Sequence, residues 1–326
     1  MTTRLKLFAA TALTAACLLT GPAPASAAGY PEKDLELIVP FPPGGGVDTI
    51  SRSISEKLSS RLGRAVVVMN KTGAGGLIGT RAGARAAPDG YTITAASLNF
   101  LTFPAVTKDP GFDIVKDFDP VTLIGNFPLV LVVGPQVKEK NLKEIVERAK
   151  KDPAAYSIGG SSNGGGGHVA AEMFKQRAGI NMMTIPYKGA APMNVDLIGG
   201  RLSMSFAHIT SILEQIKGGR VRPIAISAAA RSPLLPDVPT MIEEGFPDFT
   251  VGEVQFWVTR AGTPKPAIER LNKEIIEILN DREERKKIED KGGEILAGSP
   301  AELGEYIARN SKIYSEILKN AGVQPQ

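Results

Sequence analysis

The chain has 326 residues, with 38 lysines and arginines against 34 aspartates and glutamates, and only two histidines. Hydrophobic residues make up 43% and charged residues 22%, which is typical of folded globular proteins and excludes a disordered, collagen-like or coiled-coil chain. The length is comfortable for two domains. A single cysteine cannot form a disulfide within the chain, and so few histidines and cysteines argue against a metal site built from them.

The first 27 residues have the pattern of a secretory signal peptide. Arg4 and Lys6 form a basic start, residues 7–19 form a short apolar run, and residues 25–27 give the small-residue pattern of a cleavage site. The sequence therefore predicts export to the periplasm with cleavage near Ala27. A lipid anchor is not expected at Cys17, because the apolar run continues past it.

The charge that remains after this segment is small. Without Arg4 and Lys6 the chain carries 36 basic and 34 acidic residues, a net charge of +2. Nucleic-acid binding requires a clear basic surplus or patch, so we expect no nucleic-acid partner.

Strand and helix patterns alternate along the rest of the chain. The predicted strands are 35–39, 65–69, 91–96, 157–159, 183–186, 204–206, 224–227 and 254–259, with a long apolar run at 123–133. The predicted helices are 49–62, 77–86, 142–150, 168–176, 191–197, 209–217, 267–279 and 301–319. Strands separated by helices favour an α/β fold with a parallel, doubly wound sheet, and Asp48 is placed to cap the first helix.

Three glycine-rich loops each follow a predicted strand and precede a helix. They are residues 42–48, 72–76 and 160–167. Glycines allow successive backbone N–H groups to point one way, and the following helix N-terminus adds partial positive charge. One such loop is most simply a tight turn, but three of them at strand ends favour binding of a carboxylate or phosphate. The sequence contains no phosphate-binding P-loop, and the dinucleotide-binding glycine pattern is incomplete at Ile78.

A serine hydrolase is the main alternative. Residues 160–164 match the G-x-S-x-G pattern of a nucleophile elbow, with Ser162 as the nucleophile. Asp196 and His208 follow in the order that such enzymes use. Because this region is rich in glycine and serine, chance matches are easy, and we favour a protein without catalytic activity.

Several longer motifs resemble the Bug family, the TctC-like substrate-binding proteins of tripartite tricarboxylate transporters. The matching segments are residues 39–48, 73–79, 87–91, 115–121, 185–192, 196–200 and 231–240. This resemblance implies a periplasmic-binding-protein fold of type II, with two α/β lobes and a ligand cleft between them. It implies a first lobe of residues 29–124 and 235–326, and a second lobe of residues 125–234. The chain would close around its ligand at the two crossings between the lobes.

The resemblance also implies a function and its residues. The family binds a small organic carboxylate between the lobes, largely through backbone N–H groups, and delivers it to a membrane permease. No cofactor or metal is implied, and we expect a monomer. The alternative is that this protein binds the same ligand but signals to a receptor instead of supplying a permease. The first-lobe contacts correspond to Phe41, Gly44, Gly45, Asp48, Gly75, Gly76, Ser97 and Asn99. The second-lobe contacts correspond to Ser161, Ser162, Gly164, His168, Ala207 and His208.

Two departures from the family pattern bear on the ligand. Residues 164–167 are all glycine where the family has hydroxyl side chains, and Ala207 stands where the family has aspartate. Glycines leave room, and a buried ammonium group without an acceptor is costly. We therefore expect a carboxylate with a bulkier, less polar body in preference to aspartate or glutamate, unless His208 replaces the missing polar contact.

Overall fold

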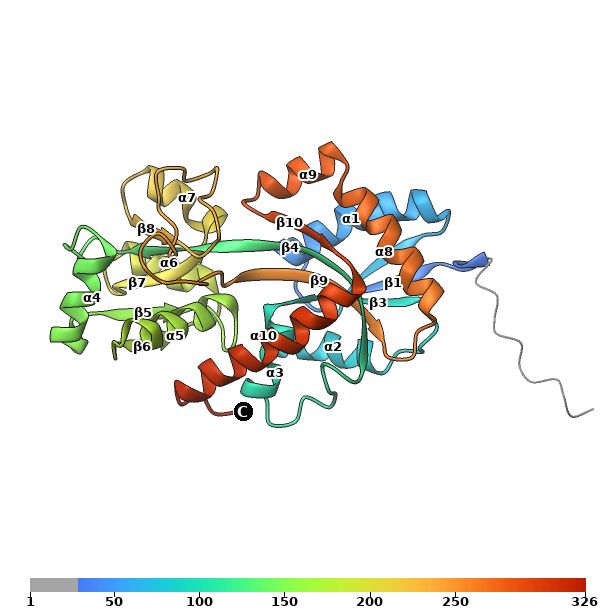
Figure 1. Cartoon of the computed structure of the whole chain (residues 1–326), viewed down its shortest axis with the longest axis horizontal. Coiled ribbons are helices and arrows are strands. Elements are labelled where there is room, and N and C mark those ends of the chain that lie inside the picture. Colours follow the sequence, from blue (N-terminus) through green and yellow to red (C-terminus); the bar gives the residue numbers. More distant parts are fainter. Residues whose placement is uncertain (1–28) are drawn as a thin grey trace, which may run out of the picture.

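The computed structural model describes residues 29–326, so the predicted signal peptide and its cleavage position lie outside the described residues. Two groups of strands and helices lie side by side (Figure 1). Two long strands, β4 (Phe118–Val133) and β9 (Gly252–Arg260), run between them. We call the group that contains the start of the described chain the first lobe and the other group the second lobe. Within residues 29–326, no helix is both long enough and apolar enough to cross a bilayer.

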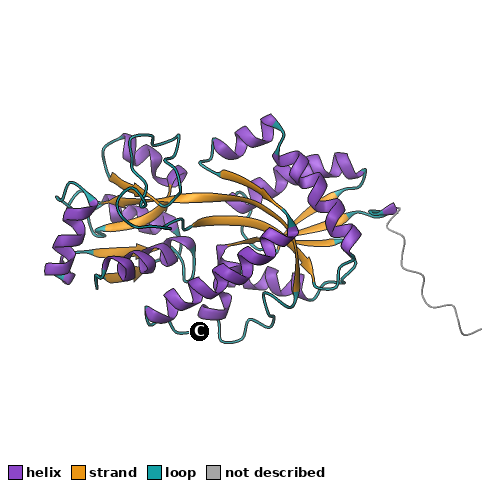
Figure 2. Ribbon diagram, viewed as in Figure 1, coloured by secondary structure: helices purple, strands orange, loops and turns teal. Residues whose placement is uncertain are grey.

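The first lobe is built from two separate stretches of chain. The earlier stretch forms β1 (Leu35–Val39), α1 (Gly46–Leu62), β2 (Val66–Asn70), the short 3₁₀ helix η2 (Ala74–Gly76), α2 (Leu77–Ala84), β3 (Thr92–Ser97) and α3 (Leu98–Val106). The later stretch forms α8 (Lys265–Leu279), α9 (Arg282–Glu289), β10 (Glu294–Gly298) and α10 (Pro300–Asn320). Helices cover both faces of the strands (Figure 2).

The second lobe lies between β4 and β9 in the chain. Its elements are α4 (Leu142–Lys151), the 3₁₀ helix η3 (Pro153–Ala155), β5 (Ser157–Gly160), α5 (Gly166–Ala178), β6 (Met183–Pro186), α6 (Ala190–Ile198), β7 (Met204–His208), α7 (Ile209–Lys217) and β8 (Arg222–Ile226). Strand β4 serves both lobes, because its first part pairs with β9 and β10 and its last part pairs with β7 and β8.

The sheet is mixed, so the prediction of a parallel sheet is only partly right. The strand order is β2-β1-β3-β9-β4-β7-β5-β6, with β10 and β8 on β4. Strands β1, β2 and β3 are parallel, as are β5, β6 and β7, but β9 runs antiparallel to β3 and β4. The reason is that β9 returns from the second lobe and enters the first-lobe sheet from the opposite end.

The second crossing between the lobes lies later than the predicted residue 235. Phe246 packs against Phe174 of α5, and Phe249 stacks on Phe206 of β7. The Oγ of Ser227 donates to the carbonyl of Val251 across the same region. The segment 235–251 therefore packs on the second lobe, and the chain returns to the first lobe at β9. Aromatic packing decides this boundary, and the sequence pattern of the segment does not display it.

One buried hydrophobic cluster runs through both lobes, and each lobe has a further cluster of its own. Ile50, Ile54 and Leu58 recur at every fourth position of α1 and are buried. Helix α10 packs on both α3 and α5, and the side chain of Gln176 in α5 donates to the carbonyl of Ile317 at 2.7 Å. Figure 1 shows α10 lying across the two lobes.

Candidate functional site

The first glycine-rich loop ends at the N-terminus of α1, which begins three residues earlier than predicted. Gly45 is the N-cap, and Asp48 lies in the first turn, where its carboxylate accepts the N–H of Gly44 at 2.9 Å. Burial alone would raise the pKa of Asp48, but hydrogen bonds from Arg52, Asn70 and Gly44 outweigh it and lower the pKa. Asp48 is 2% exposed, so its side chain shapes the loop from inside.

The backbone of this loop leaves donors free at the start of α1. The N–H of Thr49 is the first to bond within the helix, to the carbonyl of Gly45. Among the described residues, no acceptor bonds the N–H groups of Gly46, Val47 and Asp48. These three donors, together with the partial positive charge of the helix end, favour a negatively charged group.

Two buried polar side chains lie beside these donors. A Cβ on Gly46 would stand 3.8 Å from Nε2 of Gln255 in β9. Ser97 at the end of β3 pairs directly with Gln255 across the sheet, so both side chains project from the same face. Ser97 is 4% exposed and Gln255 is 5% exposed, and neither side chain has a hydrogen-bond partner within residues 29–326. We call these two side chains and the three N–H groups the α1 site.

The second glycine-rich loop lies next to the first. A Cβ on Gly76 would stand 3.3 Å from Cζ of Phe41, so the Phe41 ring closes over this glycine. Gly76 also has φ 101°, a conformation that favours glycine. The side chain of Asn99 donates to the carbonyl of Gly75 at 3.1 Å, which links the loop to α3. The first-lobe residues of the prediction therefore lie in one region.

The third glycine-rich loop ends at α5, where a side chain occupies the first of the three N–H groups at the helix end. Oε1 of Glu253 in β9 accepts the N–H of Gly166, the first residue of α5, at 2.9 Å. Nε2 of His208 lies 4.0 Å from the same oxygen. No sequence motif singles out Glu253. We call Glu253, His208 and the N–H of Gly166 the α5 site.

The glycines of this loop are required by close packing and leave no open space. A Cβ on Gly166 would stand 2.7 Å from Oε1 of Glu253, and one on Gly167 would stand 2.9 Å from the carbonyl oxygen of Phe206. A Cβ on Gly164 would stand 2.8 Å from Oγ1 of Thr102. The expectation that bare glycines leave room for a bulky ligand is therefore wrong, because neighbouring side chains and backbone already fill that room.

The predicted residues around β7 divide into two environments. Ala207 is 2% exposed and packs in the core of the second lobe, which corrects its prediction as a ligand contact. His208, the next residue, faces the α5 site with its side chain 39% exposed. Alternate residues of a strand point to opposite faces, so only one of these neighbours can face the cleft.

His168 in α5 is held in one neutral form. The N–H of Gly164 donates to Nδ1 of His168 at 3.1 Å, so the proton of the neutral ring is on Nε2. Burial lowers the pKa of His168, with a further lowering from Lys175 and an opposing effect from Glu172. His168 therefore presents an Nε2–H donor.

A cavity of about 970 Å³ lies between the lobes. Among the predicted site residues, it is lined by Gly75, Asn99, Ser162 and His168. Residues outside its lining are Phe41, Gly44, Gly45, Asp48, Gly76, Ser97, Ser161, Gly164, Ala207 and His208. Ser161 holds the next turn, because its carbonyl accepts the N–H of Gly189 at 2.6 Å. The lobes touch beside the cavity, where Oγ1 of Thr102 donates to the carbonyl of Gly164 at 2.8 Å.

A family model described as "Tripartite tricarboxylate transporter family receptor" matches residues 50–323. The chain belongs to this receptor family. It is 33% identical over 304 residues to the protein BugT of Bordetella pertussis (strain Tohama I), and the match covers 93% of each chain.

Solved structures also match the receptor in three dimensions. The periplasmic binding protein BugD is 35% identical, with a TM-score of 0.75 over 91% of this chain and 100% of BugD. The R. palustris protein Rpa4515, solved with adipate, is 28% identical, with a TM-score of 0.78 over 91% of this chain and 100% of Rpa4515. The predicted Bug-family resemblance and the two-lobed periplasmic-binding-protein fold are confirmed.

The receptor family is a family of transport proteins and not of enzymes, and the residues of the hydrolase alternative are separated. Asp196 accepts from the hydroxyl of Tyr187 and from Arg201. His208 faces Glu253 instead. No hydrogen bond joins Ser162, His208 and Asp196 in the part of the chain that the structure describes. The hydrolase interpretation is therefore wrong.

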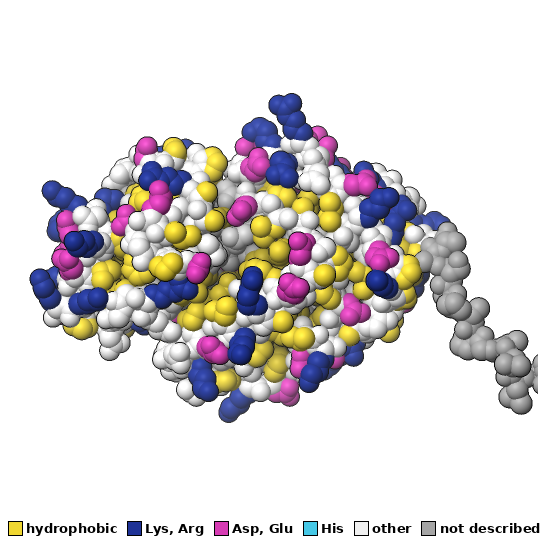
Figure 3. Space-filling model, in the orientation of Figure 1, with side chains coloured by type: hydrophobic (Ala, Val, Ile, Leu, Met, Phe, Trp, Pro, Cys, Tyr) yellow, Lys and Arg dark blue, Asp and Glu magenta, His cyan; other side chains and the backbone are white. Residues whose placement is uncertain are grey.

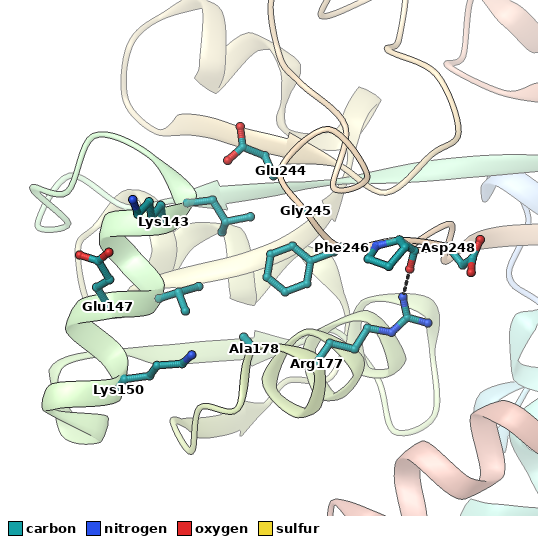
Figure 4. A pocket seen from close by; sticks show the side chains of 12 residues that line it. Lys143, Glu147, Lys150, Arg177, Ala178, Glu244, Gly245, Phe246 and Asp248 are labelled. Atoms are coloured by element: carbon teal, nitrogen blue, oxygen red, sulfur yellow. Dashed lines mark hydrogen bonds between the residues drawn. The ribbon is translucent and has the colours of Figure 1, made fainter.

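A further pocket of about 780 Å³ lies on the outer part of the second lobe of the receptor (Figure 4). Its charged side chains have both signs, and the Phe246 ring points into it. Helix α4 lines one side of it, and the Asn141 side chain caps this helix by accepting the N–H of Glu144. None of the predicted site residues lines this pocket.

Charges of both signs are also mixed over the molecular face in Figure 3. Residues 29–326 contain no group of three or more histidine, cysteine, aspartate or glutamate side chains arranged to hold a metal ion.

Proposed function

We propose that this receptor is a periplasmic solute-binding protein that captures a small organic carboxylate between its two lobes. The α1 site carries the proposal: three unbonded N–H groups at a helix N-terminus face two buried polar side chains that lack partners. Buried polar groups are almost always hydrogen-bonded, so a ligand that accepts from several donors fits this place. A carboxylate has two acceptor oxygens and the charge that a helix N-terminus favours.

The adipate-bound relative supports this ligand class. Rpa4515, solved with adipate, is similar over 91% of this chain. Adipate is a carboxylate, as the α1 site requires. The hydrogen bond between Thr102 and Gly164 joins the two lobes, which supports closure around a ligand held between them.

The test is a calorimetric screen of the mature protein against mono- and dicarboxylates, each matched with its neutral amide. We expect saturable binding of at least one acid and no heat from its amide. Solution scattering should show a smaller radius of gyration with the bound acid than without it. If every carboxylate fails, or if the amides bind as well as the acids, the proposed function is wrong.

We further propose delivery to a membrane permease, on the basis of family membership alone. Uptake of the identified acid by cells that carry the partner permease should depend on this receptor. Uptake that is unchanged without the receptor, together with a ligand-dependent transcriptional response that requires it, would favour the signalling alternative.

A further inference from the structure

We propose that the Glu253 carboxylate takes the place of a second ligand carboxylate at the start of α5. It thereby makes the site selective for acids with one carboxylate and a hydrogen-bond donor at the far end. This inference rests on the proposed function and concerns the chemistry of its ligand. It assigns a role to a residue of β9 that no sequence motif singled out.

The two helix ends lie along one strand. Glu253 and Gln255 are two residues apart in β9, so their side chains point to the same face, about 6.6–6.8 Å apart along the strand. The side chain of Gln255 lies beside the first residue of α1, and the side chain of Glu253 bonds the first residue of α5. A ligand anchored by its carboxylate at the α1 site and extended along β9 therefore meets Glu253 with its far end.

The start of α5 already holds a negative charge. The Glu253 carboxylate bonds the Gly166 N–H and so takes the place that a second ligand carboxylate would need. A dicarboxylate that reached this point would put two like charges together in a partly enclosed site, which is unfavourable. The helix end in the first lobe thus attracts an anion, whereas the Glu253 carboxylate at the helix end in the second lobe repels one.

Glu253 also has acceptor capacity left for a ligand. Oε1 is used by Gly166, while Oε2 has no hydrogen-bond partner among residues 29–326. An ionised carboxylate is only an acceptor, so it selects a hydroxyl or an ammonium group. The sequence-based expectation of an apolar far end rested on the missing acidic residue at position 207, and Glu253 supplies an acidic group from another strand.

The experiment is calorimetry of the intact mature protein with four six-carbon acids: adipate, 6-hydroxyhexanoate, 6-aminohexanoate and hexanoate. This series keeps the chain length of the acid bound by Rpa4515 and changes only the far end. We expect wild type to bind the hydroxy or the amino acid at least tenfold more tightly than adipate, and more tightly than hexanoate. Comparison of the hydroxy and amino acids identifies which donor the site takes.

Glu253→Gln should reduce the preference against adipate to less than threefold, because it removes the charge and keeps the size. Glu214→Gln is the matched control, since Glu214 is an exposed acid of the second lobe whose side chain is 77% exposed, and it should leave every ratio unchanged. If Glu253→Gln does not fold, the ratio of the wild-type affinities for the donor acids and for adipate tests the inference alone.

The inference is overturned if wild type binds adipate as tightly as both donor acids, or if Glu253→Gln leaves the ratios unchanged. In either case the carboxylates still bind, and the proposed function survives. If no acid binds in this series or in the wider screen of mono- and dicarboxylates, the proposed function fails and the inference fails with it.

Discussion

Helices α1 and α5 begin in nearly the same way, yet their ends have opposite chemistry. Each follows a strand and a glycine-rich loop, and each has a glycine N-cap in the same conformation, with φ −70° and ψ 166° at Gly45 and φ −75° and ψ 169° at Gly165. At α1 the facing residue of β9 is the neutral Gln255, and at α5 it is the acidic Glu253. The side chain that faces a helix N-terminus therefore sets the charge there and how many of its N–H groups remain free.

The sharpest way to break this comparison is to remove one N–H from each helix end. In Gly46→Pro the helix should persist, because proline suits the first helical position and Gly45 already has the extended conformation that precedes proline. The variant loses a donor of the α1 site, so carboxylate affinity should fall at least 30-fold, about 2 kcal/mol. Calorimetry measures the affinity, and an unchanged melting temperature shows that the fold is intact.

Gly166→Pro is the counterpart at α5. It removes the N–H that Glu253 accepts, and its Cβ would crowd that carboxylate, so the free energy of unfolding should fall by about 1–3 kcal/mol. Its affinity for the carboxylate should fall by less than fivefold. Equal losses of affinity in both variants would remove the distinction between the two helix ends.

Gln255→Leu sharpens the comparison at the α1 site. The buried amide has no partner in the described part of the protein, so we expect it to bond the ligand. Its loss should weaken carboxylate binding about tenfold, about 1.4 kcal/mol, with little change in thermal stability. Calorimetry with the acid and thermal denaturation without it separate the two effects. A variant that melts earlier but binds normally would make Gln255 a structural residue.

Thr102→Val tests how closely the two helix ends are held together. The variant keeps the shape of the side chain but leaves the carbonyl of Gly164 without its donor, which costs about 1 kcal/mol. Because this bond joins the lobes, the radius of gyration of the ligand-free protein should increase in solution scattering. Thr122→Val is the control, since Thr122 bonds the carbonyl of Gly298 within the first lobe. A similar expansion in the control would show that the effect is not specific to the cleft.

The smallest expected effect concerns pH and the loop that precedes α5. Burial lowers the pKa of His168, and a protonated ring cannot accept the Gly164 N–H. A base whose folded pKa lies below its unfolded value stabilises the fold above about pH 6.5, and this stability is lost as the pH falls from there towards the folded pKa. The melting temperature of the ligand-free protein should therefore drop between pH 7.5 and pH 5.0, and the drop should be smaller in His168→Gln. Equal drops would assign the pH dependence to other groups.

Much of the secondary structure was predictable, and the misses have physical causes. The bounds of β1, β6 and α7 agree with the prediction because their strand or helix patterns are local. Helix α3 was missed because it is apolar on nearly all sides and contains Pro104, so it shows no helical period. Helix α1 was predicted to start late because a glycine N-cap has no side-chain signal.

The residues of the candidate site were also predicted only in part. The glycine loops, Ser97 and His208 were found from the sequence, while Gln255 and Glu253 were missed. A signal for them exists, because they are polar residues at alternate positions among the buried apolar residues of β9. That alternation identifies a polar face of the strand, but the elements that pack on that face come from distant parts of the chain.

The α/β class, the family and the three glycine-rich loops could all be recognised from the amino-acid sequence. These properties depend on residues that are close together in the chain, such as a strand, its glycines and the helix that follows. Only the tertiary structure decided which helix end is free and which is neutralised, because the deciding side chains come from β9, more than 80 positions after the start of α5. The local pattern sets which backbone N–H groups a loop can expose, and the three-dimensional packing sets which of them remain free for a ligand.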